Sequence, residues 1–466
     1  MALCFQGLDL PTVGGDVPIF ISSNHPLIKL ANAIPWVEIS TWVSFDSLSG
    51  IERGYWHIGR KLKVRIHLGA YFLRHMFNMT YRQTERELMD NAAYQIFCGK
   101  DLTNGWHIPD HSRMFEFQKR ISPKTHAQLA NAITQLAVKY GFAQAQWMDI
   151  DSTIQDANIR RISEVSLMER LSVYAYRLQN QLQNYVPRQL IPHLLVPLDV
   201  SKIRCLAKYY FLYGKGEEQK KAWTLETMKE EMLPAILALV TFVNLLKQKA
   251  LFIPSNLARY LKLLDLNFAK LLENTNYFIH NHVGQKHKLL SLHMQEIAMF
   301  AKGAQGRMKV KYGRQWQLGR IGGNFLIIGE STGARCGDHQ SVAPMISLHW
   351  SLFGVDTLES FGTDRGYYSD ENWHGLSQIQ EMWQGAGKIF NFHLPRPGVK
   401  EFQLSEQDLV LHNRRSGVEA LIGHAKAKGQ LRRSRATTDL GMKNSGYDSI
   451  LGFNLRQFTR YLMRSN

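Results

Sequence analysis

The sequence predicts a mixed α/β core that is preceded by an all-helical domain and interrupted by a large helical insertion. Two observations support this fold class. Strand patterns occur at residues 144–151 and return only after residue 310. The residues between them, from 163 to about 305, carry leucine-rich amphipathic runs with little proline or glycine, which is typical of helices. We therefore expect one sheet whose strands are separated along the chain by a helical segment.

The N-terminal part of the chain divides into an arm and a helical domain. Residues 1–60 show little periodic pattern and carry glycine and proline, so we expect an arm with short elements. Residues 61–140 are expected to form a helical DNA-binding domain. Apolar positions follow helical spacing over residues 61–75, a capping box at Thr80 opens a second helix, and Ser112 is a candidate N-cap for a third. Short helices with tight turns suit a helix-turn-helix module, and a plain helical bundle gives the same pattern.

The core is expected to comprise residues 141–162 and 306–466, with residues 163–305 as the helical insertion. The chain is expected to be helical again from about residue 416. Alternating or β-branched runs predict five strands, at residues 144–151, 314–318, 323–330, 357–364 and 388–392.

The composition favours a nucleic-acid partner. A chain of 466 residues exceeds one ordinary core, and 45% hydrophobic with 20% charged residues excludes a mainly disordered or fibrous protein. The formal charge of +17 attracts polyanions, of which nucleic acid is the most common. Ribosomal and membrane-surface proteins share this charge, so composition does not distinguish reading, cutting or coating of nucleic acid.

Cysteine usage and hydropathy favour a cytoplasmic protein. The four cysteines lie far apart without a CxxC pair, which argues against a zinc ribbon or a disulfide framework. The N-terminus lacks a basic segment followed by a long apolar run, so no secretory signal is expected. The longest apolar run, Leu233 to Leu246, is too short to cross a bilayer, which needs about 20 residues.

Three acidic residues stand where core packing does not require them. Asp151 is expected to end an apolar strand, Asp364 follows another strand in the sequence FGTDRGYY, and Glu419 lies on a predicted helix in RRSGVEALI. Carboxylates on strand ends and on a facing helix are the oxygen ligands that Mg²⁺ prefers. Each pattern alone is also typical of a turn, an N-cap or a solvated helix face. Their combination predicts a metal site for phosphoryl transfer.

The three acidic residues also carry a family resemblance. The sequence resembles the DDE transposases of bacterial insertion sequences. In these enzymes the first aspartate precedes Ser-Thr or Gly-Thr after a strand, as Asp151 does, and the second stands in Asp-x-Gly-Tyr, as Asp364 does. The third acidic residue belongs to a helical Tyr, Arg, Glu, Lys signature with two, three and six intervening residues. Arg415, Glu419 and Lys426 fit this register, and His412 takes the tyrosine position.

Helical geometry supports the signature independently. At about 100° per residue, positions 412, 415, 419, 422 and 426 fall within a stripe of about 80°. The Arg415 and Lys426 side chains therefore share a face with Glu419. One carboxylate for metal between two cations for DNA phosphates suits an active-site face, because a structural helix would present an apolar stripe.

The resemblance implies a fold, an activity and partners. The core would be RNase H-like, as in retroviral integrases, and Asp151, Asp364 and Glu419 would hold two Mg²⁺ ions, with Mn²⁺ as a substitute. Asp151 would bridge both ions. The enzyme would cleave the terminal inverted repeats of a transposable element and join the freed 3′-hydroxyl to target DNA. Arg415, Lys426 and His412 would contact DNA, and a homodimer would pair the two ends.

Several alternatives stay open at the level of sequence. Asp149 competes with Asp151 as the first aspartate, and Asp338 competes with Asp364. A histidine-rich segment at residues 280–287 could hold a metal, although no cysteine or acidic residue stands at ligand spacing. The rival functions are a nuclease that cuts without joining and a transposase-derived DNA-binding protein whose site is idle.

Overall fold

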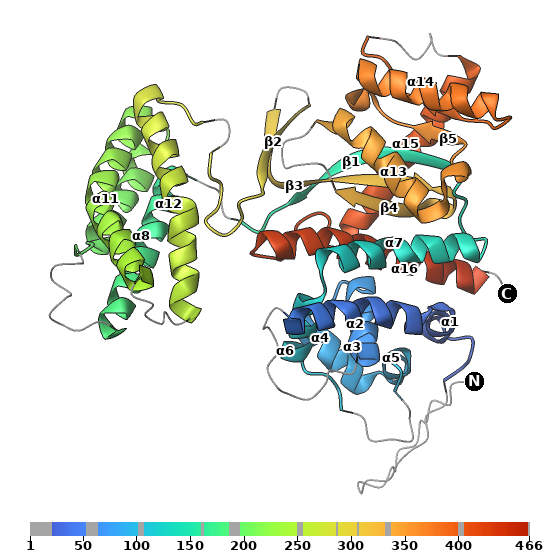
Figure 1. Cartoon of the computed structure of the whole chain (residues 1–466), viewed down its shortest axis with the longest axis horizontal. Coiled ribbons are helices and arrows are strands. Elements are labelled where there is room, and N and C mark those ends of the chain that lie inside the picture. Colours follow the sequence, from blue (N-terminus) through green and yellow to red (C-terminus); the bar gives the residue numbers. More distant parts are fainter. Residues whose placement is uncertain are drawn as a thin grey trace, which may run out of the picture. The chain divides into compact units, whose positions relative to one another are not determined.

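The chain consists of two compact units. One comprises residues 1–157, 300–436 and 440–466, and the other comprises residues 158–299 with 437–439 (Figure 1). Much of the expected arm and residues 61–63 of the expected helical domain lie outside the described residues. The computed structural model describes residues 21–52, 64–100, 107–159, 163–185, 196–248, 255–285, 288–304, 307–330, 337–398 and 405–464.

The sheet of the first unit mixes antiparallel and parallel strands. Its order is β2-β3-β1-β5-β6, and β4 also pairs with β3. Strand β1 runs antiparallel to β3 and parallel to β5, while β5 runs parallel to β6 and β4 runs antiparallel to β3. The strands are β1 (Trp147–Asp156), β2 (Ala298–Ala304), β3 (Arg307–Ile321), β4 (Phe325–Glu330), β5 (Ser360–Gly362) and β6 (Asn391–His393). The predicted combination of helices with a mixed sheet is confirmed.

Besides β3, which runs from Arg307 to Ile321 and not over residues 314–318 alone, the strands differ from the prediction in two notable places. Strand β1 continues to Asp156, so Asp151 lies in the middle of the strand and not at its end. The residues after Asp151 keep β-branched side chains, and Thr153 pairs with Trp316 of β3. The second difference is β2, which lies in the segment that was expected to be helical.

The helices from residue 64 onward follow the expected pattern, whereas the expected arm contains α2, a helix of 17 residues, and not short elements alone. The capping box is confirmed. The Thr80 side chain accepts a hydrogen bond from the Gln83 backbone N–H, and the Gln83 side chain accepts one from the Thr80 backbone N–H. The N-cap of the third expected helix lies two positions earlier than predicted, because Asp110, and not Ser112, caps it by accepting from two backbone N–H groups. The helices are α1 (Pro26–Ala33), α2 (Trp36–Glu52), α3 (Val64–Met76), α4 (Tyr81–Asp90), α5 (Ala92–Phe97), α6 (His111–Arg120) and α7 (Pro123–Lys139).

The remaining helices of the first unit cover the sheet. Helix α15 (Glu406–Ala427) packs on β1, β5 and β6, and α7 packs on β4. Figure 1 shows α7 and α16 (Asp439–Arg464) running side by side along the sheet, and α13 (Val342–Phe353) and α14 (Asp370–Gly385) complete the unit.

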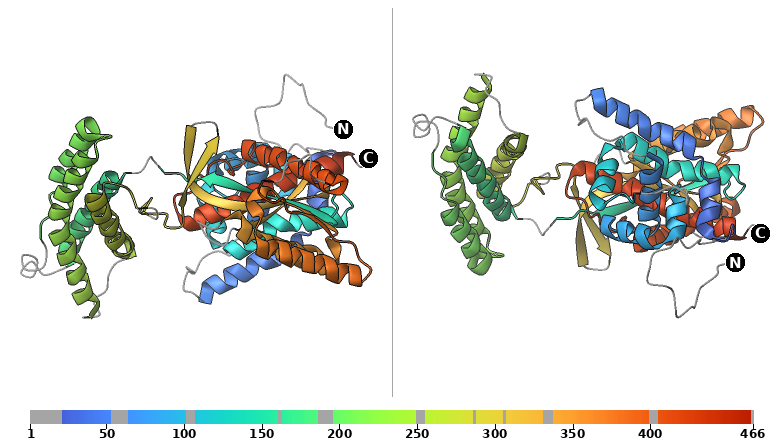
Figure 2. Two further views of the ribbon diagram at one scale, coloured as in Figure 1. Left: turned by 90° about the horizontal axis from the view of Figure 1, so that it is seen from above. Right: turned by 90° about the horizontal axis from the view of Figure 1, so that it is seen from below.

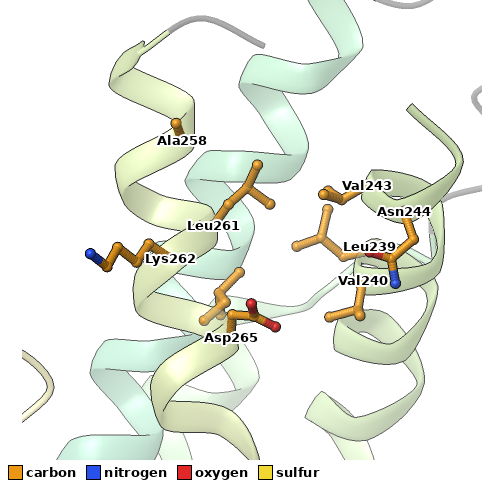
Figure 3. A pocket seen from close by; sticks show the side chains of 9 residues that line it. Leu239, Val240, Val243, Asn244, Ala258, Leu261, Lys262 and Asp265 are labelled. Carbon is orange, nitrogen blue, oxygen red and sulfur yellow. The ribbon is translucent and has the colours of Figure 1, made fainter. Parts of the chain in front are cut away.

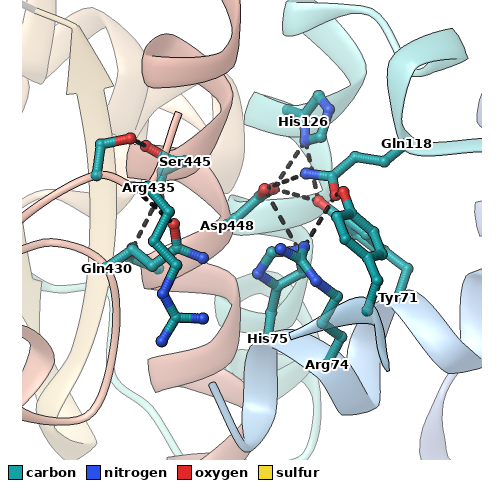
Figure 4. A network of polar contacts seen from close by, with 12 residues as sticks. Tyr71, Arg74, His75, Gln118, His126, Gln430, Arg435, Ser445 and Asp448 are labelled. Carbon is teal, nitrogen blue, oxygen red and sulfur yellow. Dashed lines mark hydrogen bonds and ion pairs between the residues drawn. The ribbon is translucent and has the colours of Figure 1, made fainter. Parts of the chain in front are cut away.

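A buried carboxylate ties α16 to the N-terminal helices. Asp448 accepts hydrogen bonds from Tyr71 Oη of α3, from His126 Nδ1 of α7 at 2.8 Å and from Gln118 Nε2 of α6 at 2.7 Å (Figure 4). Its second oxygen lies 3.3 Å from Nε2 of His75 on α3. The Asp448 side chain is only 2% exposed, so four helices depend on one carboxylate that water does not solvate.

The electrostatics of this cluster keep Asp448 charged. Burial would raise the pKa of Asp448, but the imidazoles of His75 and His126 and the hydrogen bonds that it accepts lower it to about 2. Burial lowers the pKa of His75 to about 3, and the Arg74 guanidinium 2.9 Å from its Nε2 acts in the same direction. The donors Tyr71, Gln118 and His126 therefore favour the charged form of the Asp448 carboxylate.

The second unit is a helical bundle with its own core. Its helices are α8 (Glu164–Leu182), α10 (Val200–Tyr209), α11 (Glu218–Gln248) and α12 (Ser255–Asn281), which lie side by side in the views of Figure 2. The buried Glu164 carboxylate binds Lys221 at 2.6 Å and Lys288 at 2.7 Å. A cavity of about 210 Å³ opens between α11 and α12, where Figure 3 shows Val240 and Leu261 on opposite walls. No described helix is long and apolar enough to span a membrane, including α11, which contains Leu233 to Leu246.

Candidate active site

Three acidic side chains reach one place from three different elements. Asp151 comes from β1, Asp364 caps the short turn Arg365–Tyr367 that follows β5, and Glu419 comes from α15. Strands β1 and β5 are parallel neighbours, and α15 packs against both. In this parallel register Asp149 pairs with Gly362, so Asp151 and Asp364, each two residues further along the chain, are brought close to one another.

The side chain of Arg415 lies among the three carboxylates. Its Nη2 donates to Asp151 Oδ2 at 3.1 Å and lies 3.5 Å from Asp364 Oδ2 and 3.3 Å from Glu419 Oε1. The Arg415 side chain is 13% exposed, Asp151 is 15% exposed, and Glu419 is 65% exposed. The structure therefore brings the predicted Asp151, Asp364 and Glu419 together around a single guanidinium nitrogen.

The carboxylates influence each other as well as the arginine. Burial raises the pKa of Asp151 to about 6, and the charges of Asp364 and Glu419 add to this while Arg415 opposes it. Burial also raises the pKa of Asp364, again against the effect of Arg415. The cluster holds more negative than positive charge, and Asp151 within it is mostly buried, so it favours additional cations.

The donor set suits a divalent ion, but the side chains do not surround one. Among the described residues, no group of three His, Cys, Asp or Glu side chains is arranged closely enough to hold a metal ion. Carboxylates of the kind and number that Mg²⁺ uses are present, and the guanidinium occupies the space between them. The Arg415 Nε atom is buried without a hydrogen-bond partner. Holding a metal would therefore require the Arg415 side chain to move.

Asp149, the alternative first aspartate, has its partners within the chain. It is fully buried, and both of its oxygens accept from Arg414, through Nη2 at 2.7 Å and through Nε at 3.0 Å. Arg414 also donates to Ser360 Oγ at 2.9 Å, and its guanidinium lies over the ring of Trp147. This pair links β1, β5 and α15, which makes Asp149 a positioning residue and favours Asp151 as the residue that faces a ligand.

The comparisons with known proteins concern the N-terminal part of the chain. Residues 17–120 match the transposase domain family DUF772. This N-terminal part of the chain is thus similar to a transposase domain. The matched residues hold helices α1 to α6 and precede all three acidic residues.

A curated relative and the solved structures add little to this match. A protein of Rhizobium meliloti titled "Uncharacterized protein ORF8 in nfe locus" is 26% identical over 140 residues, which are 29% of this chain and 63% of the relative. The chain thus covers less than two thirds of the length of that relative. No solved structure matches the chain.

The other predicted site residues, His412 and Lys426, lie along α15 on either side of Glu419. The His412 ring packs edge-on against His393 of β6, with ring centroids 5.5 Å apart. Lys426 is partly exposed in the last turn of α15, about 10 Å along the helix axis from Glu419. His280 and His282 lie at the end of α12 and belong to no metal-binding group of the described residues, and His287 lies outside those residues.

Asp338 lies beside the acidic cluster and does not replace Asp364. It accepts from Gln315 Nε2 and, at 3.0 Å, from Gln317 Nε2, and its charge raises the pKa of Asp364. Gln317 in turn accepts from the buried Tyr367 hydroxyl at 2.5 Å. Sequence reasoning missed this support for the Asp364 turn, because isolated glutamines on β3 form no pattern that points to a site.

Proposed function

We propose that the protein is a DNA transposase that cleaves the ends of a transposable element and transfers the freed strands into target DNA. The observation that carries the proposal is the approach of Asp151, Asp364 and Glu419 to one guanidinium in a chain with a transposase domain. The strand order β4-β3-β1-β5-β6, in which three antiparallel strands continue into two parallel ones, supports an RNase H-like core.

The proposed cofactor is a pair of Mg²⁺ ions, for which Mn²⁺ would substitute. Asp151, Asp364 and Glu419 would hold these ions through their carboxylate oxygens. When bound, such ions activate the attacking oxygen and stabilise the leaving oxygen of an in-line phosphoryl transfer. The chain itself supplies three carboxylates held by β1, β5 and α15, with Asp149 and Arg414 fixing the strand that carries Asp151.

The proposed substrate is double-stranded DNA with inverted repeats at the element's ends. The formal charge of +17 favours binding to a polyanion, and the helices of residues 61–140 are proposed to read the ends. Arg415, Lys426 and His412 are proposed to contact phosphates near the scissile bond. A homodimer is proposed because two ends must be brought together.

Cleavage of an end fragment tests the function directly. The purified chain is mixed with DNA that carries the inverted repeats flanking its gene, with Mg²⁺ or with a chelator. We expect strand cleavage and joined products with Mg²⁺ and neither with the chelator, because the reaction depends on the metal. Cleavage without joined products would mean that the protein is a nuclease. Cleavage in the presence of the chelator, or no cleavage with Mg²⁺, would contradict the proposal.

The salt dependence of DNA binding tests Lys426. Each phosphate contact contributes about 0.9 to the slope of log affinity against log salt on duplex DNA, so Lys426→Ala should lower this slope by about one and slow cleavage. Lys428→Ala is the matched control, because Lys428 is an exposed cation off the Glu419 stripe. Equal slopes for wild type and Lys426→Ala would mean that Lys426 contacts no phosphate and has only a surface role worth about 0–1 kcal/mol.

A further inference from the structure

Two neighbouring arginines on α15 bind aspartates of the same strand in different ways. Arg414 makes four hydrogen bonds, three to Asp149 and one to Ser360, and packs over Trp147. Arg415 uses one nitrogen, Nη2, for all three carboxylates and leaves its buried Nε without a partner. Several hydrogen bonds and a ring contact therefore fix the Arg414 side chain, whereas the Arg415 side chain is held mainly by its electrostatic attraction to the three carboxylates.

The position of Arg415 is incompatible with a metal ion in the same cluster. Its Nη2 lies 3.1 to 3.5 Å from an oxygen of each carboxylate. A divalent ion that these oxygens bind would lie about 2.0–2.6 Å from them, in the space that the guanidinium fills. The two cations would also repel each other strongly at such a distance, so occupancy by one excludes the other.

We propose that Arg415 is an internal counter-ion that keeps the three carboxylates together in the metal-free protein and leaves the cluster when a divalent ion binds. The planar guanidinium suits a phosphate as well as carboxylates, so the released side chain is available to the DNA backbone. Both metal binding and DNA binding require the Arg415 side chain to leave the carboxylates. Each therefore increases the affinity for the other. This inference rests on the metal site of the proposed function.

The Mn²⁺ affinity of the protein without DNA measures the competition between Arg415 and the metal ion for the three carboxylates. Mn²⁺ is titrated into the full-length chain and followed by calorimetry or by the spectrum of the free ion. Arg415→Gln should bind Mn²⁺ at least about tenfold more tightly than wild type, because no cation has to leave. Arg415→Lys keeps the positive charge without the planar guanidinium, so its Mn²⁺ affinity should lie between those of wild type and Arg415→Gln. Arg414→Gln, the matched control, should gain no affinity, because the hydrogen bonds of the Arg414 side chain go to Asp149 and Ser360 and to none of the three clustered carboxylates.

Thermal unfolding provides a second measurement. Without metal, Arg415→Gln leaves the carboxylates of Asp151, Asp364 and Glu419 without their shared cation, so its unfolding temperature should fall. Saturating Mn²⁺ should raise that temperature by more in Arg415→Gln than in wild type, because metal then replaces a missing cation and displaces none. Duplex DNA should increase the Mn²⁺ affinity of wild type and have a much smaller effect on Arg415→Gln.

The possible failures are distinguishable. If Asp364→Asn abolishes Mn²⁺ binding and Arg415→Gln binds it no better than wild type, the metal site stands and the counter-ion role of Arg415 is wrong. If Mn²⁺ binding is the same in wild type, Asp151→Asn and Asp364→Asn, the metal site of the proposed function is wrong, and the inference falls with it. Should Arg415→Gln not fold, the Arg415→Lys titration decides, and an affinity at or below that of wild type overturns the proposal.

Discussion

Asp151→Asn is expected to abolish DNA cleavage while leaving binding to the element's ends largely intact. The substitution keeps the size of the side chain and removes the charge that would hold both metal ions. Losing several kcal/mol of transition-state stabilisation corresponds to a loss of at least about 10³-fold in rate. Binding should persist because phosphate contacts are spread over the basic surface. Single-turnover cleavage and a gel-shift titration on the same end fragment measure both quantities.

Matched variants show whether the effect belongs to the site. Asp364→Asn and Glu419→Gln should match Asp151→Asn, since each proposed metal needs its own ligand. Asp356→Asn is the control, because Asp356 is an exposed carboxylate paired with Lys388 at 2.7 Å. Wild-type cleavage by Asp151→Asn together with an inactive, folded Asp149→Asn would move the first aspartate to Asp149.

The approach of the three acidic residues could be predicted from sequence because their local motifs resemble those of DDE transposases, and that resemblance implies one shared site. A strand pattern precedes Asp151 and Asp364, and helical register places Arg415 and Glu419 on one face. The structure agrees with this arrangement, since Arg415 and Glu419 are one turn apart on α15 and both lie beside Asp151. The catalytic role of these residues remains a prediction, because geometry without substrate or metal does not test it.

The features that sequence did not predict depend on contacts between distant residues. The strand around Asp151 continues beyond it because Ser152 and Thr153 find partners on β3, and such pairing is absent from a local pattern. Strand β2 was assigned to a helix because short apolar segments fit both periods. The inward position of Arg415 depends on a side-chain rotamer, which helical spacing restricts and does not determine.

The Asp448 cluster is the clearest case of a feature without a sequence signal. Its partners Tyr71 and His126 lie 377 and 322 residues away along the chain. A single buried aspartate within an amphipathic helix gives no periodic pattern, and it is usually expected to face water. The cluster also shows that the matched transposase domain, which contains Tyr71 and Gln118, is bound to the C-terminal helix by more than apolar packing.

Asp448→Ala is expected to destabilise the first unit by about 3–5 kcal/mol, because removing one member of a buried charged cluster leaves its partners unpaired. The change would expose the His126 and Gln118 donors and the Tyr71 hydroxyl to an apolar interior, where each unsatisfied group costs about 1–3 kcal/mol. Denaturant unfolding followed by tryptophan fluorescence measures the effect. Trp223 is the one tryptophan in the sequence of residues 158–299, so this signal reports mainly on the first unit.

The control is an aspartate that also accepts hydrogen bonds but is exposed to solvent. Asp110 caps α6 and pairs with Arg113 at 3.4 Å with a side chain that is 45% exposed, so Asp110→Ala should cost about 1 kcal/mol. Asp448→Asn should lose nearly as much stability as Asp448→Ala, because its amide group turns one acceptor into a donor that faces Gln118 or His126. An unfolding midpoint for Asp448→Ala equal to that of Asp110→Ala would mean that the packing of α16 on α3, and not the carboxylate, holds these helices together.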